Sequence, residues 1–72
     1  MFKNKKVLVT GGAGMIGRQL VDLLVDKGAI VSIADLNAPL DLPDNVYYIN
    51  ANLLYFDQCE SICEGMDYVF NL

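Results

Sequence analysis

Short apolar runs alternate with helical stretches along this chain. Four short apolar runs, the first three bounded by Gly, Asn or Asp, predict strands at residues 5–10, 29–34, 46–49 and 68–72. Residues 36–45 hold two prolines and several polar turn formers, so they predict a connection rather than a helix.

The first helical stretch, residues 15–27, has an amphipathic period. Its predicted apolar stripe follows positions i, i+4, i+7 and i+8, namely Ile16, Leu20, Leu23 and Leu24. Val21 and Val25 widen this stripe, whereas charged residues such as Arg18 fall largely away from it. Gly28 can take the left-handed conformation that ends a helix. A second, shorter helix is expected at residues 57–64, with Asp57 as its N-cap and Gly65 as its stop.

This order of elements predicts an α/β fold with a parallel sheet of four strands in the order 3-2-1-4. Right-handed crossovers then place the two helices on opposite faces. The apolar fraction of 54% fits strands that are buried on both faces. Two helices cannot cover both faces of such a sheet, so we expect exposed apolar strand residues and self-association of an isolated segment.

Charge and hydropathy exclude several classes of partner. The net charge is −4 and the five basic residues form no stripe, so nucleic acid is not expected. The basic start at residues 3–6 precedes an apolar run far too short for a signal peptide, and no run could span a membrane. We therefore expect a cytoplasmic protein without a membrane partner.

Cys59 and Cys63 lie four positions apart in the second predicted helix, on one helix face. The chain has no histidine and no third cysteine, so the sequence supports no cysteine/histidine zinc site. We expect two buried, reduced thiols and no metal site.

A glycine-rich loop joins the first strand to the first helix. Gly12, Gly14 and Gly17 match G-x-G-x-x-G, while Gly11, Gly14 and Gly17 match G-x-x-G-x-x-G. A preceding strand and a following helix are the context in which this motif predicts dinucleotide binding. A glycine-rich turn that binds nothing is the alternative. A phosphate-binding P-loop is excluded, because no Gly-Lys-Ser/Thr closes the loop.

Pyrophosphate binding explains each glycine requirement. The first turn of a helix has unpaired N–H groups and a partial positive charge, both of which attract phosphate. The phosphates reach those groups only if Gly14 has no side chain. Gly11 allows a tight turn, and Gly17 allows the helix to approach the sheet.

Asp35 closes the second apolar run, 18 positions after Gly17. In dinucleotide-binding folds an acidic residue about 20 positions on accepts hydrogen bonds from the adenosine ribose. Leu36 and Asn37 follow it, with no arginine to accommodate a 2′-phosphate, so we expect NAD in preference to NADP. A turn residue at a strand end is the alternative for Asp35.

The segment Thr10–Gly17 resembles the opening of the extended short-chain dehydrogenase/reductase family, in its NAD-dependent epimerase/dehydratase branch. The resemblance extends over the whole chain and implies a partial Rossmann-like sheet. It implies a fingerprint of Thr10, Gly11, Gly14 and Gly17, pyrophosphate bound by the backbone of Met15 and Ile16, and ribose bound by Asp35.

Two later segments also resemble this family. Residues 50–53 (Asn-Ala-Asn-Leu) stand where the family usually has Gly-Asp-Leu, which implies that Asn52 and its neighbour Leu53 lie at the adenine. An asparagine carbonyl can still accept the adenine amino group, but without charge. A simple turn residue is the alternative for Asn52. Residues 65–72 resemble the family's fourth strand, and the small residues that usually follow are missing.

The family's catalytic Tyr-x-x-x-Lys motif has no match here, and we assign no catalytic residue. We expect residues 1–72 to be the N-terminal part of an NAD(P)-binding domain, inactive alone, without the catalytic and substrate-binding regions. The resemblance implies an enzyme that epimerises or dehydrates a nucleotide sugar through hydride transfer with NAD. A non-catalytic NAD(P)-binding regulatory protein is the alternative, and a downstream Tyr-x-x-x-Lys would favour the enzyme.

Overall fold

The computed structural model describes residues 1–11 and 14–72. Its elements, in chain order, are β1 (Lys6–Thr10), α1 (Met15–Asp26), β2 (Ile30–Asp35), β3 (Val46–Asn50), α2 (Phe56–Cys63) and β4 (Tyr68–Asn71). Every predicted element is present, and each of its ends lies within one residue of the prediction. Gly12, which belongs to one of the two predicted glycine spacings, lies outside the described residues.

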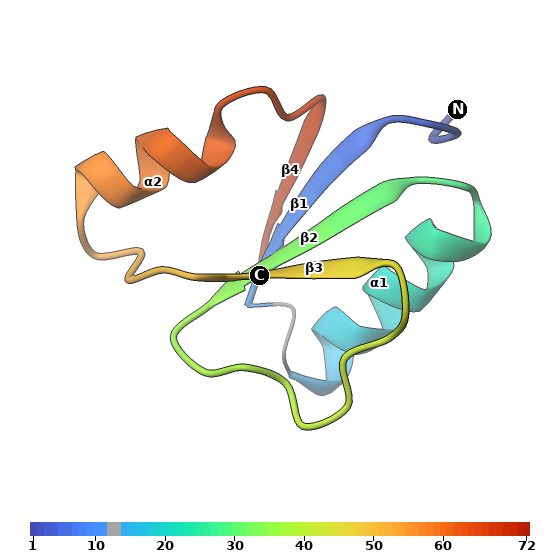
Figure 1. Cartoon of the computed structure of the whole chain (residues 1–72), viewed down its shortest axis with the longest axis horizontal. Helices are drawn as coiled ribbons and strands as arrows, with labels where there is room; N and C mark the ends of the chain where they lie inside the picture. Colours follow the sequence, from blue (N-terminus) through green and yellow to red (C-terminus); the bar gives the residue numbers. More distant parts are fainter. Residues whose placement is uncertain (12–13) are drawn as a thin grey trace.

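The strands form one parallel sheet in the order β3-β2-β1-β4, as predicted (Figure 1). Val9 of β1 pairs with Ile33 of β2 and with Phe70 of β4. The central strands β1 and β2 are buried over most of their length, whereas β3 is partly buried and β4 is largely exposed. Burial on both faces, which the composition predicted, therefore holds for the central strands alone.

The main core lies between α1 and one face of the sheet. Its fully or nearly fully buried residues come from three strands and from α1: Val7, Val9, Val31, Ile33, Val46, Val21 and Leu24. Successive side chains of a strand point to opposite faces. Leu8 and Thr10 therefore point to the other face, where Thr10 shares a cavity with Cys59 and Ile62 of α2. The two helices thus cover opposite faces, as the crossover rule predicted.

The buried side of α1 differs from the predicted stripe. Gly17, Val21 and Leu24 are buried, whereas Ile16 is 74% exposed and Leu23 is 52% exposed. Because Gly17 has no side chain, the helix can approach the sheet most closely along the line from Gly17 to Leu24. Ile16 lies in the first turn and lines the open cavity at the carboxyl edge of the sheet.

The end of α1 confirms the predicted glycine stop. Gly28 has φ of +85°, and its N–H donates to the Val25 carbonyl at 3.0 Å. The N–H of Ala29 donates to the Leu24 carbonyl at 3.0 Å. This pair of bonds is a Schellman motif, which satisfies carbonyls that the helix leaves without partners.

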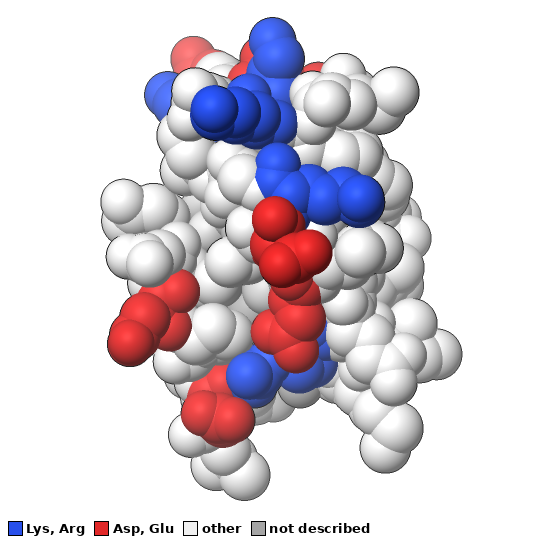
Figure 2. All heavy atoms as spheres, turned by 90° about the vertical axis from the view of Figure 1, so that its right-hand side faces the viewer, with Lys and Arg blue, Asp and Glu red and all other residues white. Residues whose placement is uncertain are grey.

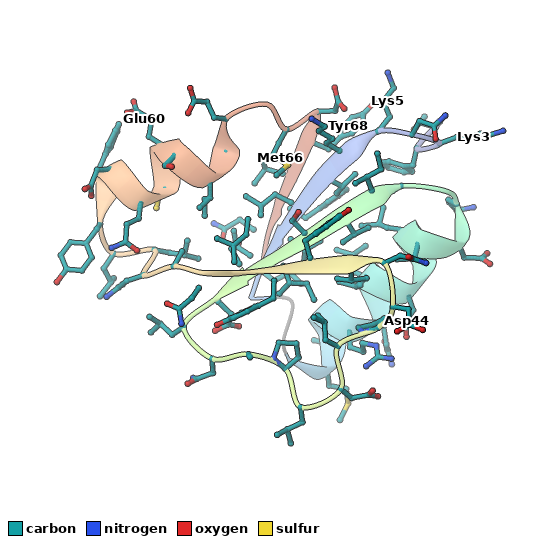
Figure 3. All side chains as sticks on the ribbon, viewed as in Figure 1. Lys3, Lys5, Asp44, Glu60, Met66 and Tyr68 are labelled. Carbon is teal, nitrogen blue, oxygen red and sulfur yellow. The ribbon has the colours of Figure 1, made fainter. Side chains whose placement is uncertain are left out.

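The second helix packs more loosely than α1. It has no buried residue, and Figure 3 shows Glu60 on its outer side, pointing away from the sheet. The prediction that Asp57 is the N-cap is wrong, because the turn that starts at Asn52 makes Tyr55 the N-cap. The stop near Gly65 is confirmed, since this residue has φ of +77° directly after the helix end.

The cysteines of α2 are free, as predicted, but they are not both buried. Cys59 is half-buried and Cys63 is exposed. The prediction of two buried thiols is wrong because α2 has so little packing on the sheet. Large side chains are also exposed on the outer strands, where Tyr47 is 62% and Val69 is 45% exposed. Self-association of an isolated segment stays a prediction.

The amino ends of the strands lie away from the glycine turn. There Phe2 packs edge-on against Tyr68, with ring centroids 5.2 Å apart, and Figure 3 labels Tyr68, Lys3 and Lys5 at this end of the molecule. On the face seen in Figure 2, basic side chains gather at the top of the view, and acidic side chains separate them from a basic side chain near the bottom. Among the described residues, no helix is long and apolar enough to cross a bilayer.

Candidate functional site

Two adjoining cavities open at the carboxyl edge of the sheet. Gly11 and Leu72 line both of them. The chain passes from β1 to β2 and β3 on one side, and then returns to add β4 on the other side of β1. Open α/β sheets bind ligands where the strand order reverses in this way. We call the two cavities the phosphate cavity and the adenosine cavity, after the parts of a dinucleotide that each one suits.

The phosphate cavity lies at the N-terminus of α1. It measures about 590 Å³ and is lined by Gly11, Gly14, Met15, Ile16, Gly17 and Leu72. The first N–H groups of a helix have no acceptor within that helix. Met15 and Ile16 therefore bring backbone donors to this cavity, and the helix dipole adds positive potential. Both features favour a phosphate group.

The glycines of the phosphate cavity have different physical roles. Gly11 has φ of +74°, and a Cβ there would lie 3.2 Å from the Leu72 carbonyl oxygen. Gly14 has φ of −80°, which any residue can adopt, and a Cβ there would meet only the Gly11 carbonyl oxygen among the described atoms, at 3.9 Å. The fold therefore requires glycine at position 11, whereas the described residues place no such requirement on position 14.

The adenosine cavity lies where β1, β2 and β3 end. It measures about 270 Å³ and is lined by Gly11, Ala34, Asp35, Leu36, Ala51, Asn52, Leu53, Leu54 and Leu72. Apolar walls with a few polar groups are typical of small-molecule sites. Three predicted residues, Asp35, Asn52 and Leu53, are brought together here from separate segments of the chain.

Asp35 is both a turn residue and a cavity residue. Its Oδ1 accepts the N–H of Leu36 at 2.7 Å and that of Asn37 at 3.4 Å. Its backbone carbonyl accepts the Tyr48 hydroxyl at 3.0 Å and the Ala51 N–H at 3.2 Å. Among the described residues, Oδ2 has no hydrogen-bond partner. The two interpretations of Asp35 are thus compatible, because one oxygen holds the turn and the other is available to a ligand.

Asn52 combines the same two roles. Its Oδ1 accepts the Leu54 N–H at 3.0 Å, and its own N–H donates to Gln58 Oε1 at 2.7 Å. A carbonyl oxygen has two lone pairs, so Oδ1 can accept a second hydrogen bond. The turn interpretation is therefore correct for Asn52, and its place in the cavity leaves the adenine interpretation as a prediction.

Thr10 holds the sheet edge next to the site. Its hydroxyl donates to Asn71 Oδ1 at 2.7 Å, which joins the ends of β1 and β4. Thr10 is buried and lines neither the phosphate cavity nor the adenosine cavity. Thr10 thus stabilises the end of the strand from which Gly11 departs, and its part in cofactor binding stays a prediction.

Arg18 forms salt bridges with two acidic side chains. Its Nε donates to Asp22 Oδ1 at 3.0 Å, and its Nη1 donates to the Asp41 carbonyl at 2.6 Å and to Asp41 Oδ2 at 3.2 Å. Hydrogen bonds to Asp22 and Asp41 raise the pKa of the Arg18 guanidinium. This cation joins α1 to the connection between β2 and β3, and it lines neither cavity.

Sequence patterns did not identify Leu36, Leu54 and Leu72 as site residues, although all three line the adenosine cavity. Leu36 directly follows Asp35, and the strand order 3-2-1-4 places the end of the last strand beside Gly11, so both could have been found. Leu54 carried no such signal. Within residues 1–11 and 14–72, no three metal-ligating side chains gather.

Several known proteins resemble this chain in sequence. The model of the NAD dependent epimerase/dehydratase family matches residues 7–72. A 3 beta-hydroxysteroid dehydrogenase/Delta 5→4-isomerase of Mycobacterium tuberculosis is 37% identical over 68 residues, which cover 92% of this chain and 18% of that protein. UDP-glucuronic acid decarboxylase 1 of Arabidopsis thaliana is 32% identical over 74 residues, which cover 97% of this chain and 17% of that protein.

Solved structures resemble the whole described fold. The epimerase Mth375 of Methanothermobacter thermautotrophicus has a TM-score of 0.83 at 32% identity, and the match covers 99% of this chain and 23% of that one. The Bordetella bronchiseptica enzyme WbmF, in complex with NAD+ and UDP, has a TM-score of 0.81 at 30% identity, with the same coverage. The chain thus spans about a fifth of the length of these relatives.

Proposed function

Because this chain belongs to the NAD-dependent epimerase/dehydratase family, we propose that it binds NAD at the carboxyl edge of its sheet. The pair of adjoining cavities carries this proposal. The pyrophosphate would lie at the N–H groups of Met15 and Ile16, and the adenosine would lie beside Asp35, Asn52 and Leu53. The structure of the similar enzyme WbmF contains NAD+.

The same site favours NAD over NADP. The carboxylate of Asp35 can accept hydrogen bonds from both ribose hydroxyls of NAD. In NADP one of these hydroxyls becomes a phosphate, whose negative charge would face the carboxylate. The described lining of the adenosine cavity includes no basic residue, and Arg18 is engaged by Asp22 and Asp41.

For the whole protein we propose an epimerase or dehydratase that acts on a nucleotide sugar. WbmF in complex with UDP and the similarity to UDP-glucuronic acid decarboxylase 1 support this substrate class. Bound NAD would supply reversible hydride transfer, and the residues of this chain would hold and orient it. No residue here matches a catalytic motif, so residues 1–72 alone are expected to show no turnover.

Calorimetric titration of NAD into the whole protein tests the binding proposal. We expect saturable binding, and the variant Glu60→Gln on the outer side of α2 should bind with the same affinity. A folded protein that binds no NAD would contradict the proposal. Turnover assays with UDP-sugars and with a 3 beta-hydroxysteroid test the substrate class, and activity on the steroid alone would exclude a nucleotide sugar.

A further inference from the structure

We propose that Gln58 is a positioning residue for adenine recognition, and that it acts by holding the backbone of Asn52. This inference rests on the proposed NAD site and adds a residue that neither the glycine loop nor the strand ends contain. Gln58 is half-buried in the first turn of α2. Its Oε1 accepts the Asn52 N–H at 2.7 Å.

The turn between β3 and α2 has few other restraints. Two hydrogen bonds within the turn involve Asn52. Its Oδ1 accepts the Leu54 N–H at 3.0 Å, and its backbone carbonyl accepts the Tyr55 N–H at 3.1 Å. These bonds shape the turn but do not attach it to a helix. Gln58 supplies that attachment at Asn52, and the Cys59 thiol adds a second one by donating to the Leu53 carbonyl at 3.2 Å.

The contact with Gln58 matters because Asn52 and Leu53 line the adenosine cavity. The hydrogen bond fixes the backbone of Asn52 and with it the direction of the side-chain amide. Without the glutamine oxygen, the half-buried Asn52 N–H would lose its acceptor and the turn could rotate to reach water. The amide oxygen would then leave the position from which it can accept the adenine amino group.

Gln58 would act through Asn52 rather than by touching the ligand. Gln58 does not line the adenosine cavity. It lines an open groove between β3 and α2, together with Ile49, Asp57 and Ser61. The N-cap of α2, Tyr55, makes no side-chain capping bond. Among the described residues, Gln58 and Cys59 are the side chains that join the start of this helix to the preceding turn, and only Gln58 contacts Asn52.

The experiment compares four forms of the whole protein: unmodified, Gln58→Met, Gln58→Glu and Gln19→Met. Methionine keeps the length of the side chain and removes the acceptor, whereas glutamate keeps an acceptor oxygen. Gln19 is exposed on α1, so Gln19→Met controls for the same chemical change away from the site. Each form is titrated with NAD and with nicotinamide hypoxanthine dinucleotide, in which the adenine amino group is replaced by a carbonyl oxygen.

We expect Gln58→Met to weaken NAD binding by roughly twofold to tenfold, which corresponds to the loss of one ordinary hydrogen bond. The hypoxanthine analogue lacks the amino group from which Asn52 would accept a hydrogen bond. Gln58→Met should therefore change the affinity for this analogue less than the affinity for NAD. Gln58→Glu and Gln19→Met should bind NAD like the unmodified protein. This pattern would support a positioning role that depends on the base.

Two results would overturn the inference while leaving the proposed function intact. One is unchanged NAD binding by a folded Gln58→Met variant. The other is an equal loss for NAD and for the analogue, which would indicate a general loosening of the turn. If Gln58→Met does not fold, Gln58→Asn replaces it. This variant keeps the amide but shortens the side chain by one methylene, which moves the acceptor away from the Asn52 N–H, and the same two outcomes apply. An unmodified protein that binds no NAD would overturn the proposed function itself.

Discussion

The two helices of this protein support the same site by different means. The first, α1, has 12 residues, buries Gly17, Val21 and Leu24 against the sheet, and ends in a Schellman motif. The second, α2, has 8 residues, none of them buried, and begins at a residue without a side-chain cap. Yet both helices begin near the carboxyl edge, where the cavities lie.

This difference separates the two halves of the site. The phosphate cavity uses backbone N–H groups, whose direction is set by a helix that packs in the main core. The adenosine cavity uses the side chains of Asp35 and Asn52, whose turns are held by hydrogen bonds. The Tyr48 hydroxyl donates to the Asp35 carbonyl, and Gln58 Oε1 accepts the Asn52 N–H. Core packing therefore stabilises one half, while polar contacts hold the other. Four predictions test this contrast, from the largest expected effect to the smallest.

The contrast predicts unequal costs for truncating the two helices. Leu24→Ala in α1 should lower the free energy of unfolding by about 2–5 kcal/mol, since Leu24 is 2% exposed and its removal leaves a cavity. Ile62→Ala in α2 should cost much less, because Ile62 is only half-buried. Urea denaturation of the whole protein measures both values. Equal losses would show that α2 is as firmly packed as α1.

Gly14→Val should remove NAD binding and leave the fold intact. The φ of −80° suits valine, and its side chain would enter the space of the pyrophosphate. We expect a loss of roughly 100-fold or more, because each charge-assisted hydrogen bond is worth about 1.5–3 kcal/mol. Calorimetry measures the affinity and circular dichroism checks the fold. Gly14→Ala should lose less, and a folded valine variant with full affinity would refute the role of this glycine.

Asp35→Ala should narrow the preference for NAD over NADP. Two unit charges about 4 Å apart interact by roughly 4 kcal/mol at an effective dielectric near 20. Screening in an open site reduces this repulsion between the carboxylate and the 2′-phosphate. About a third of the repulsion would still make NADP bind roughly tenfold more weakly than NAD. Dissociation constants for both cofactors measure the effect. Asp44→Ala is the matched control in the exposed connection, where Figure 3 labels it, and should change neither constant. Tighter NADP binding by the unmodified protein would contradict the assignment.

Tyr55→Asp should stabilise the weaker helix. The N-cap of α2 has extended dihedrals, with φ of −101° and ψ of 123°, but no side-chain capping bond. An aspartate there could accept a backbone N–H of the first turn and should raise the free energy of unfolding by about 0.5–1 kcal/mol. Thermal denaturation measures the gain. An unchanged melting temperature would indicate that the first turn of α2 is already satisfied.

Much of this fold followed from local patterns. Short apolar runs bounded by turn formers predicted all four strands, because a buried strand needs little more than length and β-branched residues. The glycines predicted both helix stops, since Gly28 and Gly65 adopt the positive φ that other residues disfavour. The handedness of crossovers then predicted the strand order and the separate faces for the helices.

The errors have two physical causes. Ile16 and Leu23 fit a helical period, but they are exposed because α1 approaches the sheet most closely at Gly17. Cys59 and Cys63 were expected to be buried, but α2 packs only loosely on the sheet. In these two cases the packing of a helix against the sheet decided the outcome. Asp57 has the chemistry of an N-cap, but the local turn that starts at Asn52 places the N-cap at Tyr55.

The sequence by itself determined the elements of this protein, their order, and the chemistry of the glycine turn, because these depend on neighbours along the chain. Only the tertiary structure decided which residues share the site. Parallel register places Asp35 opposite Asn50, and β4 beside β1 brings Leu72 to Gly11. It also decided that Arg18 is paired with Asp41 and that Gln58 holds Asn52. These contacts depend on distances across the sheet and between helix and turn, which periodicity along the chain does not encode.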